Sequence, residues 1–299
     1  MADQSWLMEF PKMDRTDLVG LRKALDGAYR DFSRTYGDAI EAFFDPLLVF
    51  LVWFEKLLLA APWLIVLAVL VGITHAAARS WKLTAGVFTA FVLIGYFGMW
   101  DNTMRTLAII TVATLLSIII GIPVGIGMAR SDRAQGVVTP ILDVMQTMPA
   151  FVYLIPVVML LGIGKVPGII AVIIYAIPPL IRLTNLGIRL VDREVLEAAT
   201  AFGATPTQRL FKVQFPLAMP TIMAGINQTI MMALAMVVIA SMIGVKGLGQ
   251  PVLKSITNQY FTMGLLNGLA IVAIAIMFDR VSQTYAKRSQ KHLEGMHGG

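Results

Sequence analysis

Long apolar runs, separated by short charged segments, dominate this chain of 299 residues. An α-helix needs about 20 consecutive apolar residues to cross the hydrocarbon core of a bilayer. Backbone polar groups in lipid must be hydrogen-bonded within the protein, so such runs form helices. The pattern therefore predicts an all-α integral membrane protein of about seven spans, at 58–78, 83–100, 103–129, 137–162, 168–189, 217–243 and 260–279.

The segment before these spans has a mixed pattern. Residues 1–46 are polar and amphipathic and rich in both Asp and Arg, and residues 40–57 are apolar but interrupted by Glu41, Asp45, Glu55 and Lys56. This favours an N-terminal interfacial amphipathic helix that lies on the bilayer. A single longer span that reaches about residue 72 is the alternative. The first forty residues lack the apolar core of a cleavable signal peptide.

Composition supports a membrane protein and narrows its chemistry. Hydrophobic residues make up 57% of the chain and charged residues 14%, whereas a soluble domain has about 25% charged residues. No cysteine is present, which excludes disulfides and thiolate metal sites. His75, His292 and His297 lack the spacing of metal ligands, and no catalytic grouping appears inside the spans. We therefore expect no metal site and no catalytic residues.

Lysine and arginine side chains gather in alternate connections between the expected spans. Such residues accumulate in short cytoplasmic loops of membrane proteins. This puts the N-terminus outside and the C-terminus in the cytoplasm, and it accounts for the net charge of +6 without a nucleic-acid partner. The opposite loops hold only Arg105, Lys165, Lys246 and Lys254.

A polar, basic segment interrupts the apolar pattern at 197–220, EAATAFGATPTQRLFKVQFPLAMP. Asp192 can cap a short helix before it, and Gly203 can end that helix in the left-handed conformation. Thr205 can cap a second helix whose first position is Pro206. Pro216 is expected to break the second helix before the next span begins.

Two short helices joined at a glycine predict a docking surface. They would display Phe202, Leu210 and Phe211 among charged residues, as a contact between a helix and a groove requires. An ordinary amphipathic loop is the simpler reading. Such a loop would not need a glycine stop and a proline restart at this spacing, so we favour docking to a soluble cytoplasmic partner.

These residues resemble a known family. Glu197-Ala198-Ala199, Gly203 and the end at Pro216 closely resemble the EAA loop of ABC importer permeases. The resemblance covers residues 100–285, and several stretches are similar to glycine betaine/proline betaine permeases. These are MQTMPAFVYLIP (145–156), GIGKVPG (162–168), IPPLIRLTNLGIR (177–189), LAMPTIMAGINQTIMMALAMVVIASMIG (217–244) and GLGQ (247–250).

The resemblance implies the transmembrane domain of a type I ABC importer for glycine betaine, proline betaine or choline-type quaternary amines. It implies a homodimer in the bacterial inner membrane, two ATPase subunits beneath it and a substrate-binding protein outside. The chain would be no enzyme and would bind no cofactor, with ATP-Mg held by the ATPase. The residues that this resemblance assigns to ATPase coupling are Glu197, Ala198, Ala199, Phe202, Gly203, Pro206, Arg209 and Phe211.

The same reading divides the chain into four parts. Residues 1–57 form the polar tail and interfacial helix, and residues 58–100 form accessory transmembrane helices. Residues 101–282 form the core permease domain, which contains the cytoplasmic coupling loop at 192–216. Residues 283–299 form a basic cytoplasmic tail.

Polar residues inside the spans are candidates for a translocation path, because they are costly in lipid. Asp143, Gln146 and Thr147 share one helical face by their spacing. Hydrogen bonding between helices is the alternative role for each. Pro149, Pro156, Pro178 and Pro179 are expected to break or kink two spans. The full set of path candidates is Asp143, Gln146, Thr147, Tyr153, Asn227, Gln228 and Thr229.

Other functions fit the sequence less well. An importer of another small solute, such as an amino acid, remains the nearest alternative. A self-contained secondary transporter predicts inverted repeats and ion-coupling charges, which are not evident. The chain has no G-x-x-x-x-G-K-[ST] motif, so it lacks a P-loop with which to hold ATP itself.

Overall fold

The computed structural model describes residues 12–295 and the side chains of residues 12–285. Helices are the only regular secondary structure in this part of the chain, as the apolar pattern predicts. Parts of the predicted N-terminal region (1–57) and basic tail (283–299), namely residues 1–11 and 296–299, lie outside the described residues. The helices are α2 (Arg15–Ala60), α3 (Trp63–Ala78), α4 (Trp81–Tyr96), α5 (Trp100–Arg130), α6 (Asp132–Thr147), α7 (Ala150–Leu161), α8 (Lys165–Ala176), α9 (Pro178–Arg189), α10 (Arg193–Ala201), α11 (Pro206–Arg209), the π-helix η1 (Leu210–Gln214), α12 (Phe215–Ala240), the 3-10 helix η2 (Ser241–Ile243), α13 (Gly249–Asn258) and α14 (Phe261–Gly295).

Four of the described segments are long and apolar enough to span a membrane: Trp100–Arg130, Lys165–Arg189, Pro206–Ile243 and Phe261–Tyr285. Two bent pairs raise the number to six if each pair forms one span. The predicted count of seven is therefore not confirmed. The predicted fourth span, 137–162, is not one straight helix, because α6 and α7 meet at 100°. The break lies at Met148 and Pro149, where a kink was expected.

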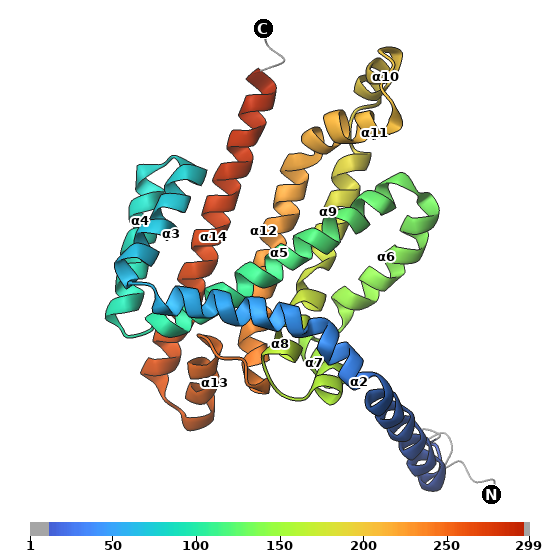
Figure 1. Ribbon diagram of the computed structural model, residues 1–299, viewed down its shortest axis with the longest axis vertical. Coiled ribbons are helices and arrows are strands. Elements are labelled where there is room, and N and C mark those ends of the chain that lie inside the picture. The colour runs from blue at the N-terminus through green and yellow to red at the C-terminus, as the bar shows by residue number, and fades with distance from the viewer. Residues whose placement is uncertain (1–11, 296–299) are drawn as a thin grey trace, which may run out of the picture.

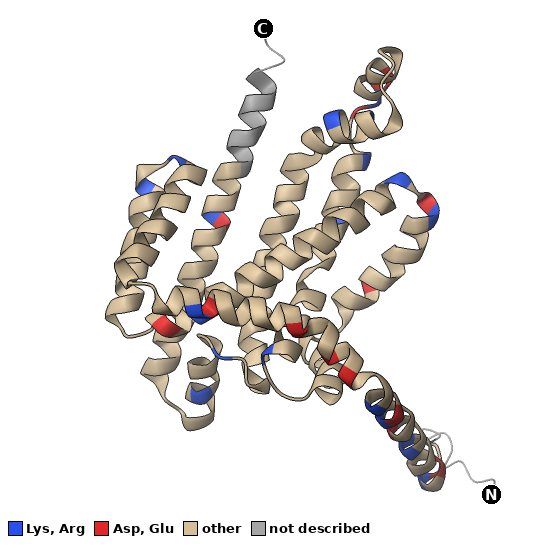
Figure 2. Ribbon diagram, viewed as in Figure 1, with Lys and Arg blue, Asp and Glu red and all other residues tan. Residues whose placement is uncertain are grey.

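The N-terminal helix α2 continues for 46 residues and then bends by 110° into α3. A straight span from residue 40 to about 72 is therefore wrong, since the chain turns at Ala61 and Pro62. Figure 2 shows both signs of charge along the first half of α2, the part that projects away from the bundle. Its second half packs on the bundle through Leu51, which is fully buried. The position of α2 relative to a bilayer stays a prediction.

Helix α9 lies between α5 and α12, and glycines make this close packing possible. A Cβ atom at Gly125 of α5 would lie 2.6 Å from the Cβ of Thr184 and 2.8 Å from the carbonyl oxygen of Ile181. A Cβ at Gly225 of α12 would lie 3.2 Å from the Cα of Leu180. Small residues let helix backbones approach closely in membrane proteins, where apolar burial drives little association. The three helices therefore form one tightly packed unit.

The two ends of the bundle differ in character. In Figure 1, α10 and α11 lie at the same end as the turn between α5 and α6, and the turn between α7 and α8 lies at the opposite end with α13. Figure 2 shows basic residues at the turns of the first end. Basic loops that are separate in sequence therefore lie together at one end of the folded molecule (Figure 2).

Candidate functional site: an exposed two-helix segment and the polar groups of the bundle

The first helix between α9 and α12 is α10, and it begins and ends where the sequence predicts. The Asp192 carboxylate accepts a hydrogen bond from the backbone N–H of Glu194 at 2.9 Å, which caps α10. Gly203 has φ of 79°, and its N–H donates to the carbonyl of Thr200 at 2.9 Å. The N–H of Ala204 donates to the carbonyl of Ala199 at 3.0 Å. These two bonds form a Schellman motif, which fixes the end of α10.

The second helix starts immediately afterwards with a capping box. The N–H of Gln208 donates to the Thr205 hydroxyl at 3.3 Å, and the Gln208 side chain accepts from the N–H of Thr205 at 2.9 Å. Pro206 occupies the first turn, where its missing N–H costs nothing. The role of Gln208 was not predicted, although the spacing Thr-x-x-Gln is the signature of this motif. The turn between α10 and α11 is thus specified by local hydrogen bonds.

Pro216 does not break the helix, contrary to the prediction. The chain runs as one helical segment from Pro206 to Ile243. The π-helix η1 precedes Pro216, and the N–H of Phe215 donates to the carbonyl of Leu210, five residues back. A π-turn widens the backbone locally, so a proline that lacks an N–H is accommodated without ending the helix. The second helix is therefore a direct extension of α12.

The apolar side chains of the segment fall into two groups. Phe202 is 93% exposed and Phe211 is 57% exposed, as a docking surface requires. Leu210 is 2% exposed, so the prediction that it is displayed is wrong. It packs with Ile188 of α9 and Ile222 of α12 in a small core. Leu210 therefore anchors the segment to the bundle.

The predicted coupling residues are all exposed or half-buried. Glu197, Ala198 and Ala199 lie on α10, and none of the residues of that helix is buried. Arg209 donates to the Thr200 hydroxyl at 3.2 Å and so joins α11 to α10. Between these helices lies an open hollow of about 330 Å³, lined by Arg193, Leu196, Glu197, Thr200, Ala201 and Arg209. We name residues 192–211 the two-helix surface.

The base of the two-helix surface is fixed to a second turn. The Arg189 guanidinium, at the end of α9, contacts the Asp132 carboxylate and the Met128 carbonyl, both at 2.8 Å. Its Nε donates to the Asn185 side chain at 3.1 Å. Met128 lies in the last turn of α5, and Asp132 is the first residue of α6. This contact was not predicted, because Asp132 and Met128 lie 57 or more residues from Arg189 along the chain.

The polar candidates in the bundle separate into an exposed pair and buried contacts. The Asp143 carboxylate forms an ion pair with Arg182 of α9, and their side chains are 57% and 36% exposed. Gln146 and Thr147 are exposed on the same helix as Asp143. Tyr153 is buried, and its hydroxyl donates to the Met145 carbonyl across the bend between α6 and α7.

The candidates on α12 point in different directions. Gln228 is exposed, whereas Thr229 is fully buried. The Asn227 amide donates to the Asp279 carboxylate of α14 at 2.8 Å and accepts from the Ser282 hydroxyl at 2.7 Å. Asn227 therefore joins two helices, and the structure does not bring it together with Asp143. Asp279 was missed by the sequence analysis.

The chain is similar to known transport proteins over most of its length. The family described as "Binding-protein-dependent transport system inner membrane component" matches residues 117–291. The chain is 50% identical over 242 residues to the glycine betaine/proline betaine transport system permease protein ProW of Escherichia coli (strain K12), covering 79% of this chain and 67% of that protein. It is 49% identical over 220 residues to the glycine betaine transport system permease protein OpuAB of Bacillus subtilis (strain 168), covering 72% of this chain and 78% of that protein.

A solved structure shares the fold. An inward-facing conformation of the MetNI methionine ABC transporter matches with a TM-score of 0.57 and 21% sequence identity, covering 62% of this chain and 93% of the matched chain. This likeness concerns the fold alone. The family match covers more than half of the chain, and it includes all of the two-helix surface. The chain belongs to the family of binding-protein-dependent transport system inner membrane components.

Proposed function

We propose that the chain is the transmembrane permease subunit of an ATP-driven importer for glycine betaine, proline betaine and related quaternary amines, including choline. The observation that carries this proposal is 50% identity over 242 residues to a relative named for glycine betaine and proline betaine transport. A Listeria monocytogenes relative named for glycine betaine and carnitine, 45% identical over 234 residues, supports the same solute class. An importer of another small solute, such as an amino acid, is the alternative.

The two-helix surface is the proposed contact with the ATPase. Phe202 projects from its tip, and Glu197 and Arg209 line the adjoining hollow. An exposed aromatic side chain beside charged groups suits a cleft in a partner protein. Two ATPase subunits would bind ATP-Mg and dock beneath two copies of this permease. A binding protein would deliver the solute at the opposite end.

The attachments of the two-helix surface support a role as a lever. Three residues, 190–192, separate α9 from α10, and α11 runs without a break into α12. Leu210 and the hydrogen bond from Arg189 to the Met128 carbonyl fix its base to α12, α9 and the last turn of α5. A force on Phe202 would therefore move α5, α9 and α12 together. Alternating access requires such movement of rigid bodies.

The Asp143–Arg182 pair is the proposed polar element of the translocation path, and Gln146 and Thr147 are exposed on the same helix as Asp143. Gln228 is exposed on α12. Arg182 lies seven residues before Arg189, which places it about 10 Å from the end of α9. Charged side chains at such depth face water or a partner and not lipid. A betaine carries a cationic and an anionic group, so it can exchange with each member of the pair in turn.

The proposed topology places the N-terminus outside and the C-terminus in the cytoplasm. The proposed division is an accessory part at 58–100 and a core at 101–282. The basic turns at the end that carries α10 support this orientation.

Uptake by reconstituted vesicles tests the function. The permease is reconstituted with its ATPase, and binding protein loaded with radiolabelled glycine betaine is added outside with ATP inside. We expect ATP-dependent uptake that unlabelled proline betaine competes with and an unrelated amino acid does not. Uptake by the permease without the ATPase would contradict the proposal, as would preference for the amino acid.

A further inference from the structure

Glu55 has an unusual environment for a charged residue. It is 7% exposed, and within the described part of the chain it is the only buried Asp, Glu, Lys or Arg. Burying a carboxylate is strongly unfavourable unless cations and hydrogen bonds compensate for the lost water. It lies on α2, before the residues that the family model matches. A charged group in such a position requires a structural or functional reason.

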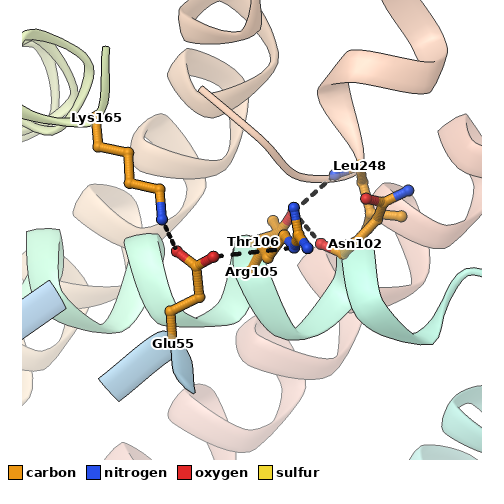
Figure 3. Close-up of polar contacts among 6 residues, drawn as sticks. All are labelled: Glu55, Asn102, Arg105, Thr106, Lys165 and Leu248. Atoms are coloured by element: carbon orange, nitrogen blue, oxygen red, sulfur yellow. Dashed lines mark hydrogen bonds and ion pairs between the residues drawn. The ribbon is translucent and has the colours of Figure 1, made fainter. Parts of the chain in front are cut away.

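Two cations from the core of the permease supply that compensation. The Lys165 ammonium lies 2.7 Å from one carboxylate oxygen of Glu55, and the Arg105 Nε lies 3.9 Å from the other. Figure 3 shows Glu55 between them, with Lys165 reaching from α8 and Arg105 from α5. Lys165 is the closer partner, and it directly follows the turn that joins α7 to α8. One carboxylate thus connects three elements that are distant in sequence.

A fourth element joins the network next to Arg105. The Thr106 hydroxyl donates to the carbonyl of Asn102 and accepts from the N–H of Leu248, both at 2.9 Å. Figure 3 shows these bonds on the turn of α5 that also carries Arg105. A Cβ at Gly247 would lie 2.6 Å from the Thr106 hydroxyl oxygen, so the loop before α13 packs closely on this turn. This end of α5 is therefore a junction for α2, α8 and that loop.

Helix α2 also contacts α7 at two points far from Glu55. The Tyr29 hydroxyl donates to the carbonyl of Pro156. A Cβ at Gly37 would lie 3.9 Å from the carbonyl oxygen of Leu160. The contacts at Tyr29, Gly37 and Glu55 follow α7 through its last turns and into α8. Helix α2 therefore crosses the outer ends of α7, α8 and α5, at the end of the bundle opposite α10 (Figure 1).

We propose that Glu55 is a positioning residue for the outer mouth of the translocation path, holding α2 as a strap across the turn between α7 and α8. This turn, residues 162–164, then moves only together with α2. The inference rests on the proposed transport function, because the strap would control the end that receives the solute. It adds a role for the N-terminal helix, which lies outside the matched family region.

The test combines uptake with a spectroscopic measurement of the turn. The chain has no cysteine, so Ile163→Cys, at a position 75% exposed, provides a single site for a spin label. Glu55→Gln keeps the shape of the side chain and removes its charge. We expect a more mobile label at residue 163 and about tenfold slower uptake, since breaking a buried ion pair leaves its partners uncompensated. Association with the ATPase should not change.

Matched variants separate positioning from a general loss of structure. Glu41→Gln makes the same substitution at an exposed position of α2, and it should change neither the label nor uptake. Glu55→Asp keeps the carboxylate, and the flexible Lys165 side chain should follow it, so uptake should be largely retained. A wild-type spectrum together with unchanged uptake in Glu55→Gln would overturn the proposal.

A second variant decides the question if Glu55→Gln does not assemble. Lys165→Met leaves Glu55 paired with Arg105 and should also increase label mobility at residue 163. A wild-type spectrum in Lys165→Met would overturn the proposal. Failure of the wild-type complex to take up glycine betaine would instead contradict the proposed function, and the label would still report whether α2 restrains the turn.

Discussion

Phe202 and Leu210 are eight residues apart, yet the fold gives them opposite surroundings. Leu210 is 2% exposed in a core with α9 and α12, whereas Phe202 is 93% exposed at the tip of the two-helix surface. Full exposure of a large aromatic residue stabilises nothing within the subunit. At an interface, exposed aromatic side chains commonly become the residues that dominate binding. Phe202 is therefore best explained by a partner.

Phe202→Ala should weaken association with the ATPase without destabilising the permease. We expect at least about a tenfold loss of affinity, the range found for aromatic residues at the centre of interfaces. Pull-down of the purified ATPase and thermal unfolding in detergent measure the two effects. Phe261→Ala removes a residue that is 79% exposed at the opposite end and serves as the control. Equal binding by both variants would remove Phe202 from the proposed contact.

Gly203 contributes through its backbone alone. Its φ is 79°, and a Cβ there would meet no atom within 4 Å. Any penalty for a side chain at this position is therefore conformational, about 1–2 kcal/mol for an ordinary residue. Gly203→Val should reduce ATPase-coupled uptake while the protein still inserts, and Gly203→Asn should retain most of it, because Asn tolerates this conformation. Equal uptake by the two variants would refute this account of the turn.

At the scale of elements, the proposed transmission depends on how closely helices pack. Gly121 and Gly125 lie on one face of α5, and both approach α9. The Arg189 guanidinium at the end of α9 also donates to the carbonyl of Met128 in the last turn of α5. On the other side, a Cβ at Gly187 of α9 would lie 3.2 Å from the carbonyl oxygen of Ala218 in α12. In the proposed mechanism, a force applied at α10 would therefore be distributed over α5, α9 and α12.

Gly125→Val should disrupt this packing. Its Cβ would lie 2.8 Å from a backbone oxygen, which cannot move aside by a change of rotamer. We expect a loss of about 1–3 kcal/mol in stability from overpacking. Thermal unfolding of the purified permease measures it. Gly127→Val, on the same helix with no atom within 4 Å, is the matched control and should unfold near the wild-type temperature.

The ion pair between α6 and α9 allows a test of the path. Arg182→Gln removes the group proposed to receive the solute carboxylate and leaves the two-helix surface intact. We expect roughly tenfold slower uptake of glycine betaine, because the solute carboxylate would lose its cationic partner at a partly exposed site. Binding to the ATPase should be normal. Unchanged uptake would exclude this pair from the path and leave the importer function standing.

At the scale of the molecule, local and long-range features differ in how well the sequence predicts them. The caps at Asp192, Gly203 and Thr205 were predictable, because each hydrogen bond joins residues within five positions. The burial of Leu210 and Glu55 was not, since their partners come from distant helices. The break predicted at Pro216 was wrong for another reason. A π-turn accommodates the proline within the helix, and no simple sequence pattern predicts such a turn.

The orientation of the whole molecule makes a prediction that uses its lack of cysteine. Phe202→Cys and Ile163→Cys place single thiols at opposite ends of the bundle, at positions 93% and 75% exposed. In sealed right-side-out vesicles, a membrane-impermeant thiol reagent should label residue 163 and spare residue 202. Inside-out vesicles should show the reverse. The same labelling of both sites from one side would contradict the topology, and with it the assignment of the two-helix surface to the cytoplasmic ATPase. Because the ATPase covers residue 202 in the proposed complex, its addition to inside-out vesicles should protect that thiol. Residue 163 should stay unlabelled there.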